Sequence, residues 1–230
     1  MRRYEQRDLR IGHYAVAYST YANADLVQIV TAGDEFGILL LDTEGHSAYA
    51  GQRMQRLLQR VIRRGWGFSG NAREELERLF RRITGSHPNQ TFERHPWANC
   101  SCAYLQFPNR GYGNIHVCGA GLPPIMHLGD GTQTHIDVPG SILLTIFCAD
   151  SCSPEYDNQL RPGDTVVAQS DGLTENWYRS HTEPPQFYTA VNGDHDPRTV
   201  IDTIIDAFPE CLPSADEHDD ISIVAVQKIN

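Results

Sequence analysis

The sequence has no uninterrupted apolar run near the roughly 20 residues that span a bilayer. Its first residues, Met1–Glu5, are polar and contain no apolar core of a signal peptide. No internal repeat, low-complexity segment or linker interrupts the 230 residues. These absences predict a cytoplasmic protein without membrane association, folded as one domain over residues 1–230.

The chain also has fewer basic residues than acidic ones. The chain has 19 Lys and Arg against 29 Asp and Glu, which gives a formal net charge of -10. A nucleic-acid-binding protein needs a basic surface to meet phosphates, so this charge argues against that function class. An acidic balance suits a protein that concentrates carboxylates to hold divalent cations.

The six cysteines lack the spacing of a structural zinc site. None forms a CxxC pair, and no His follows at zinc-finger spacing. Most lie within apolar runs, and no secretion signal is present. The cysteines are therefore expected to be reduced and mostly buried.

Carboxylates stand at the ends of apolar segments that read as strands. Residues 38–41 run into Asp42, residues 164–169 run into Ser170 and Asp171, and Asp219 and Asp220 precede residues 221–226. A carboxylate at the end of a buried strand is unsuited to packing in a hydrophobic core, but it is well placed to bind a cation. We expect these strand ends to meet at one place.

Asp25 joins this set through a predicted hairpin. It precedes the strand-like residues 26–30, Gly33 and Asp34 form a turn, and residues 36–41 lead to Asp42. Antiparallel arms place Asp25 and Asp42 at the same end of a sheet. The spacing permits both carboxylates to reach one cation or a pair of cations.

Helical periodicity is predicted in three segments, residues 50–62, 71–83 and 197–208. The first carries an arginine-rich face (Arg53, Arg56, Arg60, Arg63, Arg64). That face suits either an acidic partner or plain solvation, and solvation is favoured. Residues 177–193 have no clear period and are predicted to form a loop.

Oxygen ligands favour hard divalent cations such as Mg²⁺ and Mn²⁺. Asp25, Asp42, Asp171 and Asp219 supply four carboxylates, whose mutual repulsion cations would relieve. No candidate covalent nucleophile stands out, because Ser47 and Ser170 have no evident His–Asp pair to activate them. A water activated by metal ions is therefore the expected attacker on a phosphoryl group.

These residues carry a resemblance to a known family. The chain resembles the SpoIIE-type metal-dependent serine/threonine protein phosphatases of the PPM, or type 2C, superfamily. The similarity runs over roughly Ile11 to Lys228, and its combination of motifs is specific. The matching segments are Asp42–Ser47, Cys118–Pro124, Pro162–Asp164, Ser170–Glu175 and Asp219–Ser222, with Asp25 where a Gly-Gly-Asp element belongs.

The resemblance implies an α+β fold, a four-layer α/β/β/α sandwich of two antiparallel sheets flanked by helices. It also implies a pair of Mn²⁺ or Mg²⁺ ions between the sheets. Asp42 would bridge both ions and the carbonyl of Thr43 would join one. Asp171 and Asp219 would hold one ion, with Asp25 on the other side and Asp220 as a neighbour. Asp42, Asp171 and Asp219 would be the catalytic residues.

The implied reaction is hydrolysis of phosphoserine or phosphothreonine on a protein. The chain is similar to free-standing feedback phosphatases of partner-switching systems, which act on small STAS-type anti-sigma antagonists. It departs from the family pattern at Asn23 and Ala24, at Gln28, at Ser47 and at Leu122. Two alternatives stay open, a catalytically silent pseudophosphatase that binds a protein partner and a metal-dependent hydrolase of small phosphate esters.

Overall fold

The structure is a computed structural model of the 230-residue chain. The residues that it describes are 2–6, 8–16, 25–32, 35–43, 56, 60, 72–84, 100–108, 113–136, 156–183, 186, 191, 196–212 and 219–230.

The first sheet is antiparallel and six-stranded, with order β1-β2-β11-β10-β7-β8. Its strands are β1 (Arg2–Gln6), β2 (Leu9–Val16), β11 (Ile221–Lys228), β10 (Thr165–Gln169), β7 (Ile125–Gly129) and β8 (Thr132–Ile136). Its central strands β10 and β11 are apolar on both faces, which is the pattern of strands covered on both sides.

The second sheet is antiparallel and five-stranded, with order β3-β4-β5-β6-β9. Its strands are β3 (Leu26–Ala32), β4 (Glu35–Thr43), β5 (Cys100–Phe107), β6 (Asn114–Ala120) and β9 (Tyr156–Gln159). The hairpin predicted between residues 26–30 and 36–41 is confirmed by the pairing of β3 with β4.

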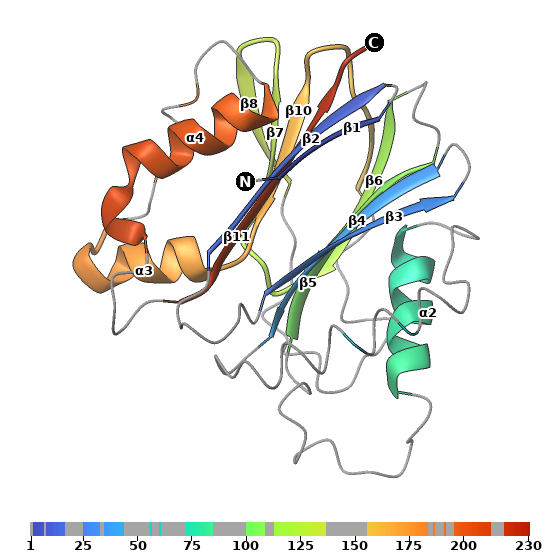
Figure 1. The fold of residues 1–230 in the computed structure, drawn as a ribbon, viewed down its shortest axis with the longest axis horizontal. Helices are drawn as coiled ribbons and strands as arrows, with labels where there is room; N and C mark the ends of the chain where they lie inside the picture. The colour runs from blue at the N-terminus through green and yellow to red at the C-terminus, as the bar shows by residue number, and fades with distance from the viewer. Residues whose placement is uncertain are drawn as a thin grey trace.

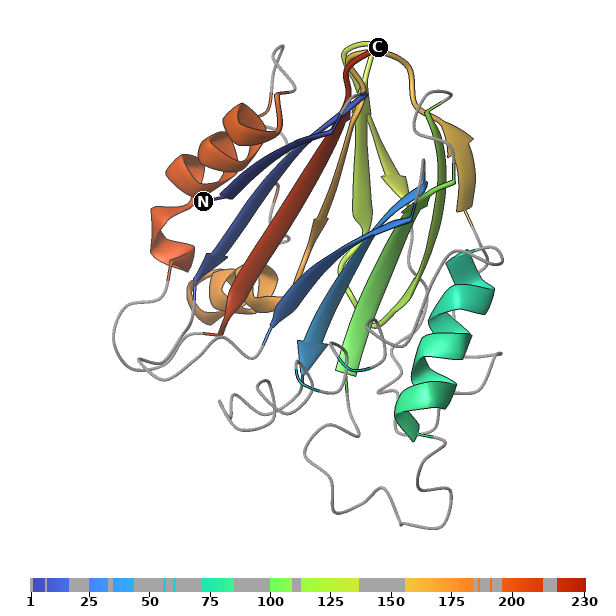
Figure 2. The ribbon, with the colours of Figure 1, turned by 45° about the vertical axis from the view of Figure 1, so that its right-hand side comes forward.

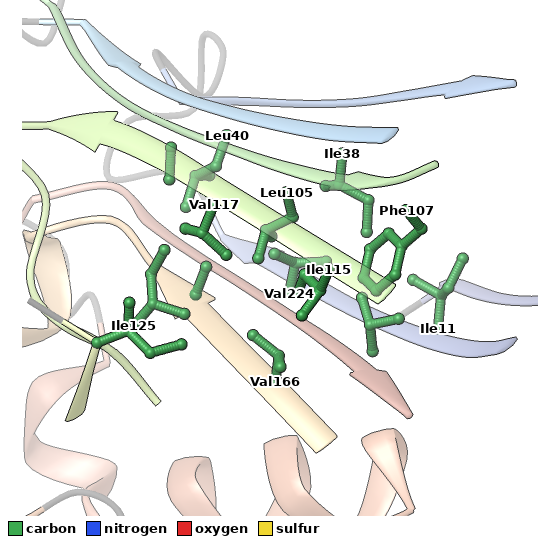
Figure 3. Packing of buried hydrophobic residues seen from close by; sticks show 14 of the residues in the cluster. Ile11, Ile38, Leu40, Leu105, Phe107, Ile115, Val117, Ile125, Val166 and Val224 are labelled. Atoms are coloured by element: carbon green, nitrogen blue, oxygen red, sulfur yellow. The ribbon is translucent and has the colours of Figure 1, made fainter. Parts of the chain in front are cut away.

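The main core lies between the two sheets. Alternate residues of the central strands β4 and β5 point into it, as period-two patterning requires. Ile38 and Leu40 of β4 face Val166 and Val224 of the other sheet, and all four are fully buried (Figure 3). Burying each such side chain contributes about 1.5–3 kcal/mol. This packing fixes the distance between the sheets, and therefore between the groups at their edges.

Helices cover both outer faces (Figure 1). Helix α2 (Ala72–Thr84) packs on β5 and β6, and α4 (Pro197–Ala207) packs on β2 and β11. Helix α3 (Gly172–Ser180) and the short 3-10 helix η4 (Pro209–Cys211) lie together beside β11. The α/β/β/α sandwich predicted from the sequence is confirmed.

The predicted helices over residues 71–83 and 197–208 match α2 and α4 closely. Asp196 caps α4 by accepting a hydrogen bond of 3.0 Å from the Arg198 amide. Of the predicted helix over residues 50–62, only Arg56 and Arg60 are described; both are helical and exposed.

One prediction was wrong in part. The loop predicted over residues 177–193 begins as helix, because α3 continues to Ser180. The stacked rings of Trp177 and His181, with centroids 3.6 Å apart, and the edge-on contact of Trp177 with Phe208 hold this end of α3 against the start of η4.

Three buried cysteines, Cys102, Cys118 and Cys211, are free thiols, as the sequence predicts. Among the described residues, no helix has both the length and the apolar character that crossing a membrane would require.

Candidate metal centre

Asp25 and Asp42 lie opposite one another at one end of the second sheet. Leu26 pairs with Leu41, so Asp25 and Asp42 come one position further along their strands at the same end. Phe36, Ile38 and Leu40 face the core, and Asp42 continues that face of β4. The hairpin therefore directs both carboxylates between the two sheets.

Asp171, Asp219 and Asp220 reach the same place from the first sheet. Gln169 pairs with Ile223, and the Ser170 amide donates to the carbonyl of Ser222 at 2.9 Å. The end of β10 and the start of β11 therefore coincide. In Figures 1 and 2, the start of β11, the adjoining end of α3 and the ends of β3 and β4 lie side by side.

Asp171 stands at the N-cap position of α3 without making a side-chain capping hydrogen bond. Its carboxyl group faces the carboxyl of Asp42 across the gap between the sheets, and this proximity contributes to raising the pKa of Asp42. The two sheets thus meet at a pair of acids whose proximity disfavours the ionised form of Asp42.

The electrostatics of Asp42 follow from this crowding. Burial is the largest cause that raises its pKa well above the ordinary value, and the neighbouring charges of Asp25, Asp171 and Asp219 raise it further.

Asp25 is similarly perturbed. Burial raises its pKa to about 8, and the charges of Asp220 and Asp219 add to the increase. The polar side chains of Ser170 and Ser222 nearby act in the opposite direction and lower this pKa. Without cations, these carboxyl groups are held together at an electrostatic cost.

Glu175 is a member of this cluster that sequence reasoning missed. Carboxylate oxygens of Asp171, Glu175 and Asp219 all lie within 4.8 Å of one another. The signal was present, because residues four apart on a helix share a face and Glu175 follows Asp171 by four. Its amide also donates to the Asp171 carbonyl at 2.8 Å, which closes the first turn of α3.

Gly172 lets the two chain segments approach. A Cβ at this position would overlap the carbonyl oxygen of Asp220. In the sequence, the acidic residue Asp171 precedes this glycine. Glycine is required here because the start of α3 lies in close contact with the residue before β11.

The sequence analysis named several further residues around the predicted site. Thr43 ends β4 directly after Asp42, and Leu122 is buried in the main core. Gln28 pairs with Leu39, on the face of the hairpin opposite to that of Ile38, Leu40 and Asp42, and its side-chain amide donates to the Ile29 carbonyl at 2.8 Å. His46 and Ser47 lie outside the described residues.

The donor set fits divalent cations of the Mg²⁺ or Mn²⁺ kind. Every acidic side chain placed at the cluster offers carboxylate oxygen, which is the ligand these hard ions prefer. The raised pKa values of Asp25 and Asp42 mark a site whose ionised form needs positive charge beside it.

Comparison with known proteins decides the family. The family model of stage II sporulation protein E (SpoIIE) matches residues 32–228, nearly the whole chain. The chain belongs to the SpoIIE family. The matched region of this SpoIIE-family chain includes Asp42, Asp171, Glu175 and Asp219, whereas Asp25 precedes it. No curated protein matches the sequence.

Solved structures confirm the PP2C-type fold of this SpoIIE-family chain. The RsbU and RsbW domains of Rv1364c from Mycobacterium tuberculosis match at 18% identity with a TM-score of 0.70, over 96% of this chain and 62% of that one. RsbX in complex with magnesium matches at 12% identity with a TM-score of 0.68, over 99% and 98%.

A third structure holds the PP2C phosphatase domain and a fragment of the regulatory domain of SpoIIE from Bacillus subtilis. It matches at 14% identity with a TM-score of 0.71, over 95% of this chain and 63% of that one. The chain thus spans less than two thirds of the Mycobacterium and Bacillus structures.

Proposed function

We propose that this SpoIIE-family chain is a metal-dependent protein serine/threonine phosphatase. One observation carries the proposal: Asp25 and Asp42 from one sheet meet Asp171 and Asp219 from the other at one end of a PP2C-type sandwich. Carboxylates gathered at this cost are typical of a site built for cations and a phosphate ester.

The ions are proposed to be Mn²⁺ or Mg²⁺, two in number. Asp42 would contact both, Asp171 and Asp219 would hold one, and Asp25, Asp220 and the Thr43 carbonyl would complete the set. Bound there, such ions would lower the pKa of a water molecule and polarise a phosphoryl group. The magnesium complex of the RsbX structure supports this choice.

The protein's own part is to hold its acids in place and to release protons. Burial and the neighbouring acids raise the pKa of Asp42, which favours a proton in the cluster when no cation is bound. That proton must leave when both carboxylates become ligands, so metal binding should release protons and tighten as pH rises.

The substrate is proposed to be a phosphorylated regulatory protein, and specifically a STAS-type anti-sigma antagonist of a partner-switching pathway. RsbX, the RsbU and RsbW domains and SpoIIE are the structural neighbours that support this class.

Substrate preference tests the proposal. The purified chain is assayed with saturating Mn²⁺ on a phosphoserine STAS-type protein, a phosphoserine peptide and a sugar phosphate. We expect turnover of the phosphoprotein to exceed that of the sugar phosphate by at least about tenfold in kcat/KM, equivalent to about 1.4 kcal/mol. The reverse preference would assign the chain to small phosphate esters, and binding of the phosphoprotein without turnover would make it a pseudophosphatase.

A further inference from the structure

Asn176 is a buried polar residue of α3 that lies close to the proposed site without supplying a carboxylate. It is 2% exposed. Its Nδ2 donates to the carbonyl of Cys211 at 3.0 Å and to the carbonyl of Asp219 at 3.3 Å. Its Oδ1 accepts a hydrogen bond of 2.8 Å from the amide of Asp219. The carboxamide thus engages both of its donor hydrogens and its oxygen.

These bonds hold the backbone of Asp219 in the way that a strand partner would. Among the described residues, the ladder between β11 and β2 begins at Ile221, paired with Val16, and Asp219 lies before that pair. Both the amide and the carbonyl of Asp219 bond to Asn176, as they would to the peptide of a neighbouring strand. A side chain therefore fixes the backbone that carries the Asp219 carboxylate.

The same helix carries Asp171 at its start. Asn176 lies little more than one turn further on, so its bonds join the element that positions Asp171 to the backbone of Asp219. One oxygen of Asp219, Oδ1, accepts the Asp220 amide at 2.8 Å, which further sets the orientation of the carboxylate. The spacing of the two proposed ligands thus depends on Asn176.

We propose that Asn176 is a positioning residue for the metal centre, acting through Asp219. The proposal rests on the phosphatase function above, in which Asp171 and Asp219 share a cation. Groups that orient metal ligands without touching the metal typically change metal affinity by about 10–100-fold when they are removed. Asn176 would contribute in this way through the main chain of the ligand.

The test compares two alanine variants that each remove a buried side chain bonded to backbone. Asn176→Ala removes the bonds to Asp219 and Cys211. Asp164→Ala is the matched control at the opposite end of β10, where Asp164 accepts from the Arg161 amide at 2.9 Å and contacts His127 at 3.0 Å. Calorimetric titration with Mn²⁺ and thermal melting in EDTA are measured for both.

We expect Asn176→Ala to weaken Mn²⁺ affinity about 10–100-fold. At saturating Mn²⁺, its KM for phosphopeptide should stay near the parent value. Asp164→Ala should melt earlier but keep its Mn²⁺ affinity within about twofold. If Asn176→Ala keeps Mn²⁺ affinity within about twofold while its melting temperature falls, Asn176 is merely structural and the proposal is overturned.

A measurement on the parent protein covers the case in which Asn176→Ala does not fold. Hydrogen exchange of the Asp219 amide is followed without metal. Exchange as slow as that of the β11 amides supports the proposal, and exchange as fast as in an open loop overturns it. This readout needs no activity, so a parent that binds no Mn²⁺ would contradict the proposed function separately.

Discussion

At the residue scale, Asp42 and Asp171 show the electrostatic cost of holding carboxyl groups close together. Burial, together with the neighbouring charge of residues such as Asp171, raises the pKa of Asp42. Asp25 follows the same rule, with its pKa raised to about 8. A folded protein keeps such carboxyl groups only when something else compensates for them, and cation binding does so.

This crowding predicts how stability depends on pH without metal. The unfolded pKa of Asp25 is near the ordinary value of 3.8 and the folded value is about 8, so the folded state binds more protons between these limits. The free energy of unfolding should therefore fall as pH rises from about 4 to about 8, by on the order of a few kcal/mol. Melting in EDTA across this range measures it.

Asp25→Asn is the control for this pH prediction. It removes the titrating group while keeping a side chain of similar shape, so the fall with pH should be smaller than in the parent. Saturating Mn²⁺ should reverse the trend, because ions favour the ionised carboxylates. A parent whose stability in EDTA is flat or rises between pH 4 and 8 would contradict the proposed crowding.

At the scale of elements, the junction of α3 with β11 determines how the first sheet delivers its acids. The start of α3 passes so close to Asp220 that only glycine fits at position 172. Ser170 Oγ accepts a hydrogen bond of 2.9 Å from the Ser222 amide, which holds the residue that follows β10 beside β11. The junction is thus specified by backbone contacts and small side chains.

Gly172→Ala should therefore damage the site more than an alanine at another glycine. The new Cβ forces α3 away from Asp220, and we expect a loss of about 1–3 kcal/mol in unfolding free energy together with weaker Mn²⁺ binding. The matched control is Gly131→Ala, in an exposed turn with φ +70° and open space around the Cβ position.

The control variant is strained only in its backbone, at a cost of about 1–2 kcal/mol, and should bind Mn²⁺ as the parent does. Chemical denaturation and calorimetry distinguish the two. Equal Mn²⁺ affinities for Gly172→Ala and the parent would show that the close approach does not position the ligands.

The acids at the strand ends could be predicted from the sequence, because side-chain alternation and the pairing of two strands joined by a short turn depend on residues that are close in sequence. Asp42 continues the inward face of β4, and the hairpin brings Asp25 to the same end. Sequence reasoning did not find Asn176 or Glu175, because α3 is short and buries only Gly172, Leu173 and Asn176. A nine-residue helix that buries so few residues gives no clear hydrophobic period in the sequence. This also explains why the loop was predicted to begin at Trp177, although α3 continues to Ser180.

Edge strands were missed for a related reason. Residues 132–135 of β8 are exposed, and β1 is polar in sequence, so neither carries the alternation that burial of one face imposes. Pairing with a neighbour defines these strands, and pairing is not a property of the segment alone.

At the scale of the whole molecule, each of the two sheets positions part of the carboxylate cluster that forms the site. The core between them is fully buried along β4, β10 and β11, which fixes how Asp42 and Asp171 face each other. Neither sheet alone contains the full set of carboxylates. The organisation of residues 1–230 as a single domain stays a prediction.

The most direct test of this account is Mn²⁺ titration combined with phosphate release from an aryl phosphate, for the parent and for Asp171→Asn. We expect Mn²⁺ to bind the parent and support turnover. Asp171→Asn should lose turnover and bind Mn²⁺ more weakly while melting in EDTA no earlier than the parent. Equal turnover by the two proteins, or no Mn²⁺ binding by the parent, would contradict a metal-dependent phosphatase built on these carboxylates.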